Sequence, residues 1–390
     1  MAGNKNLSRA MKAKNDEFYT RLTDIEKELR HYWPHFKDKV ILCNCDDPFE
    51  SNFFKFFVLN FNFLGLKKLI ATCYKESTIA NKQLSLFDVS GDVSKKGVPY
   101  KAIVTKVYDT TGDGGIDLND VINLFKSGEN ELTELKGDGD FRSQECLDLL
   151  KEADVVVTNP PFSLFREYLA TLIEYEKKFL IIGNQNAITY KEVFPLLKNN
   201  DIWLGNNNPA PKLFYVPMEL EERKNISRDE KGNLVASFGN ICWYTNLDIK
   251  KRHEDIILIR KYDPEKYPKY DNYDAINVDK VKEIPCDYAG VMGVPITFLD
   301  QYNPDQFEII GSDNYDKTPP TKKYGKKERV VDGVRKKSNT GTLGPTIRYS
   351  EFGKGTFFDV GYPVRSTYKR IFIQNKHPEL RDKYETRVTQ

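Results

Sequence analysis

The residues best suited to chemistry in this chain lie at positions 154–162. Val155–Val157 is a β-branched apolar run, and it predicts a strand that is covered on both faces of a parallel sheet. Pro160 and Pro161 cannot continue the hydrogen-bond ladder of a strand. We therefore expect Asn159–Phe162 to form a rigid turn at the carboxyl end of the strand, where open α/β sheets bind their ligands.

The residue types in this turn suit a planar amino group as the reacting partner. An exocyclic amine on a purine or pyrimidine is a poor nucleophile, because its lone pair is delocalised into the ring. The side-chain oxygen of Asn159 and the main-chain oxygen of Pro160 can accept hydrogen bonds from that amine and draw the lone pair back to nitrogen. Phe162 would stack on the base, a contact worth roughly 1–3 kcal/mol. The alternative is an ordinary proline-rich loop after a strand.

The turn resembles motif IV of the amino-group DNA methyltransferases, in which Asn, Asp or Ser precedes two prolines and an aromatic residue. Asn in the first place points to adenine N6. Six further segments follow the order that such enzymes use, and together they resemble the EcoRI-type adenine-specific DNA methyltransferase family over most of the chain. They are Lys14–Thr20, Val40–Pro48, Gly137–Phe141, Lys178–Tyr190, Gly239–Asn246 and Gly293–Leu299.

The order of apolar runs predicts the fold that would carry this turn. Strands that alternate with helical segments indicate the α/β class with a doubly wound, mostly parallel sheet. The resemblance implies a Rossmann-like, class I methyltransferase with a carboxyl-terminal target-recognition elaboration. Aromatic residues at 214–215 and 243–244 should be mostly core, in strands that form a hairpin closing the sheet. The expected elements are strands at Val40–Asn44, Leu69–Tyr74, Ala102–Val107, Asp154–Thr158 and Phe179–Gly183, and helices at Asp24–Tyr32 and Phe53–Phe63.

Chain length and motif order set the expected domains. The 390 residues can bury a substantial core and suffice for one elaborated catalytic domain or for two domains. In the motif order of the family, the cofactor and catalytic elements come first. We therefore predict a cofactor-binding catalytic domain over residues 1–250 and a target-recognition region over residues 251–390, with a boundary that could begin near residue 200.

The resemblance implies S-adenosylmethionine as the methyl donor, bound by loops that follow the first strands. The first loop lacks the G-x-G-x-x-G pattern of dinucleotide sites and instead holds Asn44, Cys45, Asp46 and Asp47. Its carboxylates can attract the ammonium and sulfonium groups of the cofactor, although both acids would also suit a helix cap. The other assigned cofactor residues are Phe18, Tyr19 and Thr20 at the methionine end, Asp140 and Phe141 at the adenine, and Asn159.

Two parts of this cofactor assignment stay open. Asp140 and Phe141 could equally belong to a plain polar loop that begins at Gly137. After the second strand, residues 72–74 hold no acid where many methyltransferases bind the ribose hydroxyls. The residue that contacts the ribose is therefore not assigned.

A basic stretch in the carboxyl-terminal half predicts contact with double-stranded DNA. The net charge of the chain is only +2, so a local patch must provide the attraction. Lysines and arginines in a loop-like stretch would neutralise phosphates and make affinity depend on salt. The alternative is a solvated or disordered loop. The predicted DNA-binding residues are Lys322, Lys323, Lys326, Lys327, Arg329, Lys336 and Lys337, and Arg348, Arg365 and Arg370 are candidates to contact guanine.

Residues 109–120 resemble a calcium-binding loop, with acids at the first, fifth, ninth and twelfth places and glycine at the sixth. Thr111 at the third place and Asp120 instead of Glu at the twelfth weaken the match. The alternative is an acidic turn that opens a helix at Val121–Phe125. A calcium ion would be structural, and no catalytic metal is expected.

Cysteine usage and hydropathy predict a cytoplasmic protein. The six cysteines include no C-x-x-C pair, which indicates reduced thiols. No apolar run has the length that spans a bilayer, and the amino terminus lacks a hydrophobic signal core. We therefore expect no membrane partner.

The pattern as a whole predicts a site-specific DNA adenine N6-methyltransferase of a restriction-modification or related system. A cognate restriction endonuclease could act on the same site without forming a stable complex. Alternatives are methylation of adenine in RNA or of a protein glutamine amide, and a non-catalytic DNA-binding relative. The basic carboxyl-terminal half favours nucleic acid over glutamine, and the intact Asn159–Phe162 turn favours catalysis.

Overall fold

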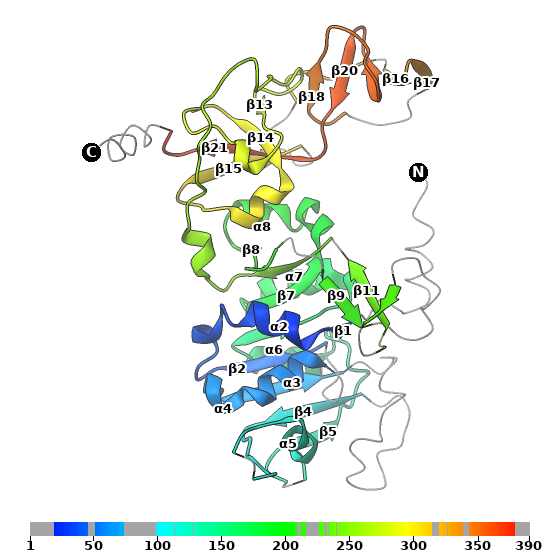
Figure 1. Ribbon diagram of the computed structural model, residues 1–390. Coiled ribbons are helices and arrows are strands. Elements are labelled where there is room, and N and C mark those ends of the chain that lie inside the picture. The colour runs from blue at the N-terminus through cyan, green and yellow to red at the C-terminus, as the bar shows by residue number, and fades with distance from the viewer. Residues whose placement is uncertain are drawn as a thin grey trace, which may run out of the picture. The chain divides into compact units, whose positions relative to one another are not determined.

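The protein is described here by a computed structural model, and its chain divides into two compact units (Figure 1). The first unit comprises Met1–Ala187 with Ile202–Ile249, and the second comprises Ile188–Asp201 with Lys250–Gln390. One division falls after residue 249, but Ile188–Asp201 also groups with the second unit, and the roles expected for residues 1–250 and 251–390 stay predictions. The residues that the structure describes are 19–45, 51–73, 99–112, 114–126, 128–208, 212–215, 226–229, 232, 234–238, 240–313, 320–325, 327–337 and 343–378.

An eight-stranded sheet forms the centre of the first unit, in the order β5-β4-β3-β2-β6-β7-β12-β8. The four central strands β3, β2, β6 and β7 run parallel, so their carboxyl ends meet at one edge. The bounds in sheet order are β5 Glu131–Glu134, β4 Tyr100–Val104, β3 Lys68–Thr72, β2 Val40–Cys43, β6 Val155–Thr158, β7 Lys178–Asn184, β12 Ile241–Thr245 and β8 Trp203–Leu204.

All five expected strands are present, and the α/β class with a parallel centre is confirmed. The third of these strands departs from the parallel order, because β4 pairs antiparallel with β3 and with β5. Residues in β4 alternate between buried and partly exposed, whereas every residue of β2 and β6 is buried. One-sided burial of this kind is typical of antiparallel strands, which can face water on one side of the sheet.

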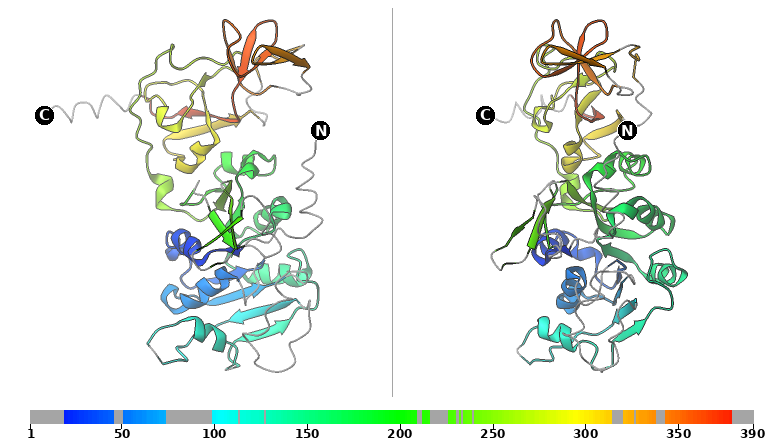
Figure 2. Two further views of the ribbon diagram at one scale, coloured as in Figure 1. Left: turned by 45° about the vertical axis from the view of Figure 1, so that its right-hand side comes forward. Right: turned by 90° about the vertical axis from the view of Figure 1, so that its right-hand side faces the viewer.

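Helices cover both faces of the central sheet (Figure 2). One face packs α2 and α3 against side chains such as Ile41 and Val155, whereas α6 and α7 bury their own apolar stripes outside that cluster. The helix expected at Phe53–Phe63 is two helices that meet at Asn60. The helices are α2 Leu22–Leu29, α3 Asn52–Leu59, α4 Phe61–Leu64, α5 Leu118–Asn123, α6 Gln144–Glu152, α7 Phe165–Glu174 and α8 Phe194–Lys198, and the 3-10 helices are η1 Trp33–His35, η3 Phe162–Leu164, η4 Gln185–Thr189, η6 Lys250–His253, η7 Val281–Glu283 and η8 Ile296–Gln301.

A separate antiparallel sheet of the first unit has the order β1-β9-β11-β10. It corrects one prediction, because Phe214 lies in β9 of this small sheet whereas Trp243 and Tyr244 lie in β12 of the central sheet. The three rings are buried as expected. The strands are β1 Tyr19–Thr20, β9 Lys212–Tyr215, β11 Leu234–Phe238 and β10 Ile226–Arg228.

The described part of the second unit contains two sheets, one with the order β13-β14-β21-β15 and one with the order β17-β16-β19-β20-β18. No helix in the described part of either unit is long and apolar enough to cross a membrane. The strands are β13 Ile276–Asn277, β14 Met292–Pro295, β15 Phe307–Ser312, β16 Glu328–Val331, β17 Val334–Lys337, β18 Thr346–Arg348, β19 Thr356–Asp359, β20 Pro363–Ser366 and β21 Arg370–Asn375.

Residues 328–337 of the basic stretch, which was expected to be loop-like, form a β-hairpin in the second unit. Strands β16 and β17 pair antiparallel, with Arg329 opposite Lys336. Asp332 and Gly333 connect them with φ angles of 47° and 82°. Two successive positive φ angles match the right-handed twist of the flanking strands, which is why such turns favour hairpins.

Candidate active site

The ends of three parallel strands are tied together around Asn44, the residue that follows β2. The main-chain nitrogen of Cys45 donates to Oγ1 of Thr158 at the end of β6, over 3.2 Å. Oγ1 of Thr72, at the end of β3, donates to the main-chain oxygen of Asn44 over 3.1 Å. All of these groups except Cys45 are buried. The carboxyl edge of the sheet is therefore a fixed junction and not a set of independent loops.

The turn Asn159–Phe162 begins at this junction, directly after Thr158, as the sequence predicted. The side-chain oxygen of Asn159 has almost no exposed surface. Pro160 is buried, and Phe162 opens the short helix η3 with its ring half-buried against the main hydrophobic core. Packing of this kind fixes the turn on a rigid support, which is what a site that orients a substrate requires.

Tyr168 joins the junction from the far side of the sheet. Its hydroxyl donates to the side-chain oxygen of Asn44, and its ring meets that of Phe141 edge-to-face with centroids 5.0 Å apart. Sequence reasoning missed this residue. A signal was available, because Phe165, Tyr168, Leu169 and Leu172 form the buried stripe of α7, and a buried tyrosine hydroxyl usually needs a partner.

Gly139 brings the loop with Asp140 and Phe141 to the same edge. Its φ is +78°, a region that favours glycine, and a Cβ there would overlap the carbonyl oxygen of Cys73, the residue after β3. The loop therefore crosses directly over the end of β3. Phe141 is only 5% exposed, so its ring is largely part of the protein interior.

The carboxylate of Asp140 is already engaged by a neighbour that the sequence did not suggest. Nε and a terminal nitrogen of Arg142 donate to it over 2.9 and 2.6 Å, and the main-chain nitrogen of Arg142 adds a third bond of 2.9 Å. Hydrogen bonds from Arg142 lower the pKa of Asp140, despite partial burial. Arg142 also binds Glu167 of α7 over 2.9 Å.

Thr20 lies beside the amino end of α3, the helix that follows the loop after β2. Its main-chain oxygen accepts from the side-chain amide of Asn52 over 2.8 Å. Oγ1 of Thr20 is buried and has no hydrogen-bond partner among the residues that the structure describes. Tyr19 precedes it in β1 and pairs with Tyr215. The assigned residues Phe18, Asp46 and Asp47 lie outside the described ranges.

Comparison with known proteins identifies the family. The model of the family described as adenine-specific methyltransferase EcoRI matches residues 6–376. The chain belongs to this family. This EcoRI-family methyltransferase is 52% identical over 313 residues to the type II methyltransferase M.EcoRI of Escherichia coli, which covers 79% of this chain and 89% of that relative. The protein is accordingly a DNA adenine methyltransferase.

Two mycoplasma proteins are also similar to this EcoRI-family methyltransferase. Type II methyltransferase M.MpnI of Mycoplasma pneumoniae is 39% identical over 312 residues, covering 78% of this chain and 84% of the relative. Type II methyltransferase M.MgeORF184P of Mycoplasma genitalium is 38% identical over 310 residues, with 78% and 84% covered. No solved structure matches the chain.

The acidic loop at residues 109–120 of the methyltransferase uses its carboxylates internally. Asp109 accepts from the main-chain nitrogens of Gly112 and Gly114 over 2.6 and 2.7 Å. Asp120 accepts from those of Asp117 and Thr110 over 2.9 and 2.6 Å. These bonds lower the pKa of both carboxyls. No group of three or more metal-binding side chains occurs in the described ranges. The described carboxylates thus form the acidic turn that was the alternative, and calcium binding stays a prediction because Asp113, the fifth place of the pattern, lies outside the described ranges.

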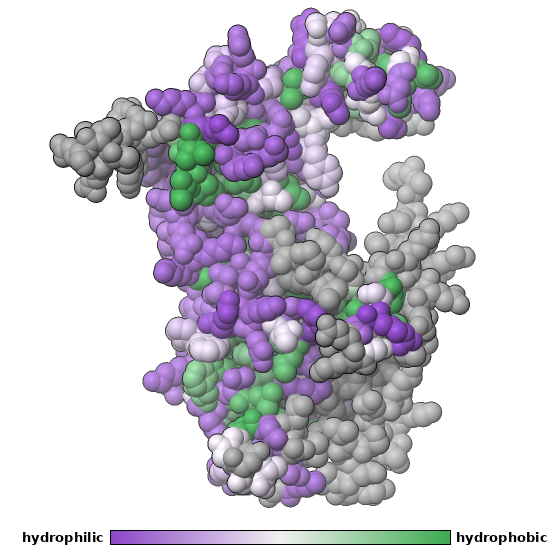
Figure 3. Space-filling view, in the orientation of Figure 1, coloured by the Kyte–Doolittle hydropathy of each residue, from purple (hydrophilic) through white to green (hydrophobic). Residues whose placement is uncertain are grey.

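The predicted DNA-binding residues of the methyltransferase lie in its second unit. They differ in exposure and in whether an acidic side chain already balances their charge. Lys322 forms an ion pair of 2.8 Å with Asp271, so its charge is already balanced. Lys327 is half-buried, and Lys326 lies outside the described ranges. The five-stranded sheet presents a mostly hydrophilic surface on the face seen in Figure 3. Besides Lys322, the exposed cations of the predicted set are Lys323, which precedes the sheet in the chain, and Arg329, Lys336 and Lys337, which lie in β16 and β17.

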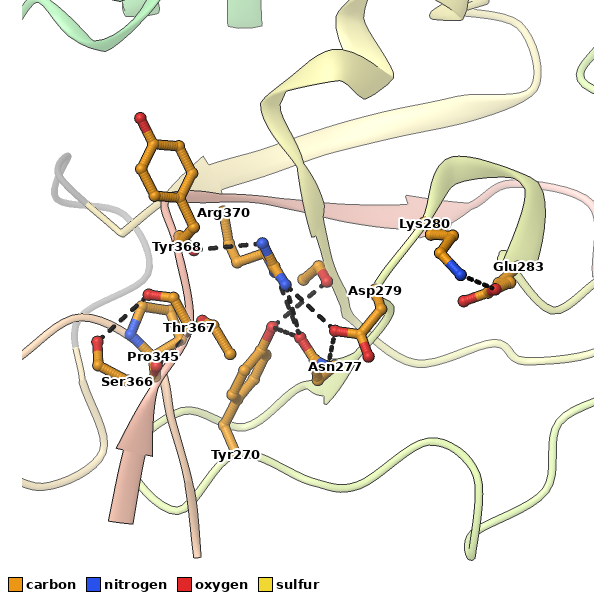
Figure 4. A network of polar contacts seen from close by, with 11 residues as sticks. Tyr270, Asn277, Asp279, Lys280, Glu283, Pro345, Ser366, Thr367, Tyr368 and Arg370 are labelled. Atoms are coloured by element: carbon orange, nitrogen blue, oxygen red, sulfur yellow. Dashed lines mark hydrogen bonds and ion pairs between the residues drawn. The ribbon is translucent and has the colours of Figure 1, made fainter. Parts of the chain in front are cut away.

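The suggestion that Arg370 contacts guanine is wrong. Arg370 is 7% exposed, and its guanidinium donates to the side-chain oxygen of Asn277 over 3.3 Å (Figure 4). It also pairs with Asp279 over 3.5 Å and donates to the main-chain oxygen of Tyr368 over 3.3 Å. These bonds hold the guanidinium inside the fold and join β21 to β13. The buried guanidinium therefore cannot reach a base edge.

Proposed function

We propose that the enzyme transfers a methyl group from S-adenosylmethionine to N6 of an adenine at a specific site in double-stranded DNA. The observation that carries this proposal is the position of the Asn159–Phe162 turn, directly beside the Asn44 junction at the carboxyl edge of the sheet. In open α/β sheets, this edge is where ligands bind. Membership of the family shows that the enzyme methylates adenine. We further propose S-adenosylmethionine as the methyl donor, the residues that bind it and the adenine, and the second unit as the part that recognises DNA.

The residues at this edge fit S-adenosylmethionine. The group supplies an electrophilic methyl when it is bound. Thr20 offers a buried hydroxyl that still lacks a partner in the described part of the chain, and a carboxylate such as that of methionine would satisfy it. Asp140 is kept ionised by Arg142, so it can still accept from an adenine amine through a remaining lone pair. Asn44, Cys45, Tyr19, Phe141 and Asn159 complete the described part of the set.

The turn itself would prepare the adenine amine for reaction. The side-chain oxygen of Asn159 and the main-chain oxygen of Pro160 would accept hydrogen bonds from the two N–H groups of the amine. These bonds localise the lone pair on nitrogen. Pro161 fixes the direction of the chain, and Phe162 lies against the base. A side-chain base of matched pKa is not needed, because the proton can leave after the methyl group has been received. The target adenine must leave the base stack, since its amine is out of reach inside a duplex.

The second unit would supply target recognition. Lys323, Arg329, Lys336 and Lys337 are exposed there and can neutralise phosphates. Lysine and arginine contacts of this kind position a duplex without reading its sequence. A cognate endonuclease that shares the site would need no stable complex with this enzyme, because each protein reads the DNA alone.

Transfer of labelled methyl from S-adenosylmethionine to plasmid DNA, followed by digestion to nucleosides, tests this proposal. We expect the label in N6-methyladenine. Label found only in RNA or in a protein amide would move the activity to those substrates. No binding of S-adenosylmethionine in a calorimetric titration would instead favour a non-catalytic DNA-binding protein.

A further inference from the structure

Asp271 of the second unit is the centre of a hydrogen-bonded cluster. Its side chain is 9% exposed, and its carboxylate accepts from Nζ of Lys322 over 2.8 Å. The hydroxyls of Tyr324 and Tyr362 also donate to it, over 2.7 and 2.9 Å. Burial alone would raise the pKa of Asp271, but the three donors outweigh it and the pKa is lowered. Asp271 therefore stays ionised and fixes both tyrosine rings.

The same segment fixes the edge strand β18. The main-chain nitrogen of Asp271 donates to the oxygen of Thr346 over 2.7 Å. The side-chain oxygen of Asn272 accepts from the nitrogen and Oγ1 of Thr346 over 2.8 and 2.9 Å. Tyr324 also hydrogen-bonds to Oγ1 of Thr346. The start of this strand is thus held to the Asp271 cluster by main-chain and side-chain bonds together.

Arg348 ends β18 and lies on one of the fixed rings. Its guanidinium carbon is 4.1 Å from the ring centroid of Tyr362, and the residue is exposed. Stacking of a guanidinium on an aromatic face leaves its N–H donors free and reduces the freedom lost on binding. Arg348 forms no ion pair with any residue in the described ranges.

Lys322 and Arg335 lack that combination, whereas the exposed Arg365 has a more distant ring, with its guanidinium carbon 5.9 Å from the centroid of Phe357. Lys322 lies over the same Tyr362 ring, 5.2 Å from its centroid, but is neutralised by Asp271. Arg335 lies 5.6 Å over Phe352 and is paired with Glu328 and Asp359 over 2.9 and 2.5 Å. Arg348 differs from Lys322 and Arg335 because its charge is not compensated, and from Arg365 because its guanidinium carbon lies closer to its ring, at 4.1 Å against 5.9 Å.

We propose that Arg348 donates two parallel hydrogen bonds to a pair of acceptors on the DNA target, and that Tyr362 and Asp271 are the residues that position it. This inference rests on the proposed function of the second unit. A planar guanidinium fork matches two kinds of acceptor pair on DNA, the oxygens of a phosphate and the O6/N7 edge of guanine. A lysine at this position would keep the charge but lose the fork.

The test compares full-length wild-type enzyme with Arg348→Ala and Arg348→Lys. One readout is the sequence around N6-methyladenine in a random duplex library, and the other is the salt dependence of DNA binding. If Arg348 contacts a base edge, Arg348→Ala relaxes one position of the site by roughly 5- to 150-fold, and Arg348→Lys does the same. If it contacts a phosphate, the site is unchanged, binding weakens, and the salt slope falls by about one in Arg348→Ala.

Arg335→Ala is the matched control, because it removes an arginine that also lies on an aromatic ring in the same sheet. We expect it to match wild type in both readouts, since its charge is already balanced. If Arg348→Ala were as close to wild type as Arg335→Ala in site and in slope, the proposal would be overturned. A wild-type enzyme that leaves no N6-methyladenine in the library would instead contradict the proposed function, and the salt slope would still report on Arg348.

Variants at Tyr362 test the positioning role. Tyr362→Leu removes the ring, so it should reproduce the Arg348→Ala pattern, and the double variant should add nothing further. Tyr362→Phe keeps the ring and loses the bonds that the hydroxyl makes with Asp271 and Lys322, so it should retain most of the selectivity or binding. Additive effects of Tyr362→Leu and Arg348→Ala would show that the ring does not position the guanidinium. Thermal unfolding of each variant separates these effects from loss of the fold.

Discussion

The hydroxyl of Tyr168 donates to the side-chain oxygen of Asn44 and so joins α7 to the loop after β2. These residues are 124 positions apart in the chain. Asn44 also accepts a hydrogen bond from Oγ1 of Thr72 through its main-chain oxygen. This single buried residue therefore links the end of β2 to the end of β3 and to α7. The geometry of the loop after β2, a candidate part of the cofactor site, therefore depends on α7, which follows the Asn159–Phe162 turn in the chain.

Tyr168→Phe should weaken binding of S-adenosylmethionine several-fold and lower the free energy of unfolding by about 1–3 kcal/mol, because the buried oxygen of Asn44 loses its donor. The Phe ring keeps the contact with Phe141. Calorimetric titration and urea unfolding measure the two effects. Tyr175→Phe, at the end of the same helix, is the control and should change neither. Unchanged cofactor affinity in Tyr168→Phe would remove Asn44 from the cofactor site.

Asn159→Ala should reduce methyl transfer by roughly 100-fold or more, by analogy with the loss of one oriented hydrogen-bonding group in other active sites. Affinity for S-adenosylmethionine should change little, since Asn159 is one of several assigned cofactor residues and its amide chiefly holds the adenine amine. Asn159→Asp keeps an oxygen acceptor and should retain more activity than the alanine variant. Single-turnover transfer and a cofactor titration test this pair. A parallel loss of cofactor affinity would contradict the assigned role.

Phe162→Ala should raise the KM for DNA by roughly 5- to 150-fold, the loss expected for one base-stacking ring. It should also destabilise the fold, because the half-buried ring packs against the main core. Phe162→Leu separates the two effects, since leucine retains most of the packing but not the aromatic face. Normal KM in a destabilised Phe162→Leu variant would make Phe162 a packing residue only.

Glu28→Gln should lower the free energy of unfolding by about 1–3 kcal/mol or more, as is usual when a buried charge loses its matched donors. Glu28 is fully buried in α2, and its carboxylate accepts from Tyr32, Asn206 and Asn207 over 2.6–2.9 Å. Glutamine would turn an amide N–H toward one of these donors. Glu26→Gln, exposed on the same helix, is the control in urea unfolding. Equal stability of the two variants would show that these bonds contribute little.

Stability of the second unit should fall as the pH drops below about 3.8. The pKa of Asp271 is lowered from 3.8 in the fold, so its contribution is present at neutral pH and is lost as the pH falls through the folded-state value. Asp271→Asn should be less stable than wild type at neutral pH and should lose less on acidification. Unfolding curves between about pH 2.5 and 7 measure this difference. Parallel curves for the two proteins would exclude Asp271 as the source.

The basic residues supply a complementary comparison. Removal of charge at Lys336 and Lys337 should flatten the salt dependence of DNA binding, because both are exposed. Lys322→Met should leave that slope nearly unchanged and instead destabilise the second unit, because Asp271 loses its cation. Filter binding across salt concentrations, with unfolding measured in parallel, separates the two. A flattened slope in Lys322→Met would return Lys322 to the DNA-binding set.

Local sequence determined the parts of this enzyme that depend on near neighbours in the chain. The valine run and the two prolines fix a buried strand and its end within a few residues, because β-branching and the missing N–H act locally. The position of the Asn159–Phe162 turn after β6 followed from these properties. The parallel order of β2, β3 and β6 was likewise predictable from the alternation of strands and helices.

Tertiary structure alone decided which polar groups are engaged. Lys322 and Arg348 look alike in sequence, yet Asp271, about 50 residues away, neutralises the first and only orients the ring beneath the second. The sequence suggested that Arg370 could contact a base, but in the fold its guanidinium donates to Asn277 of β13 and is buried. The antiparallel pairing of β4 and the hydrogen bond from Tyr168 to Asn44 could not be predicted either, because each joins segments that are distant in the chain. Pairing of a buried donor with its acceptor depends on which distant elements the core brings together, and no local preference of the chain encodes that distance.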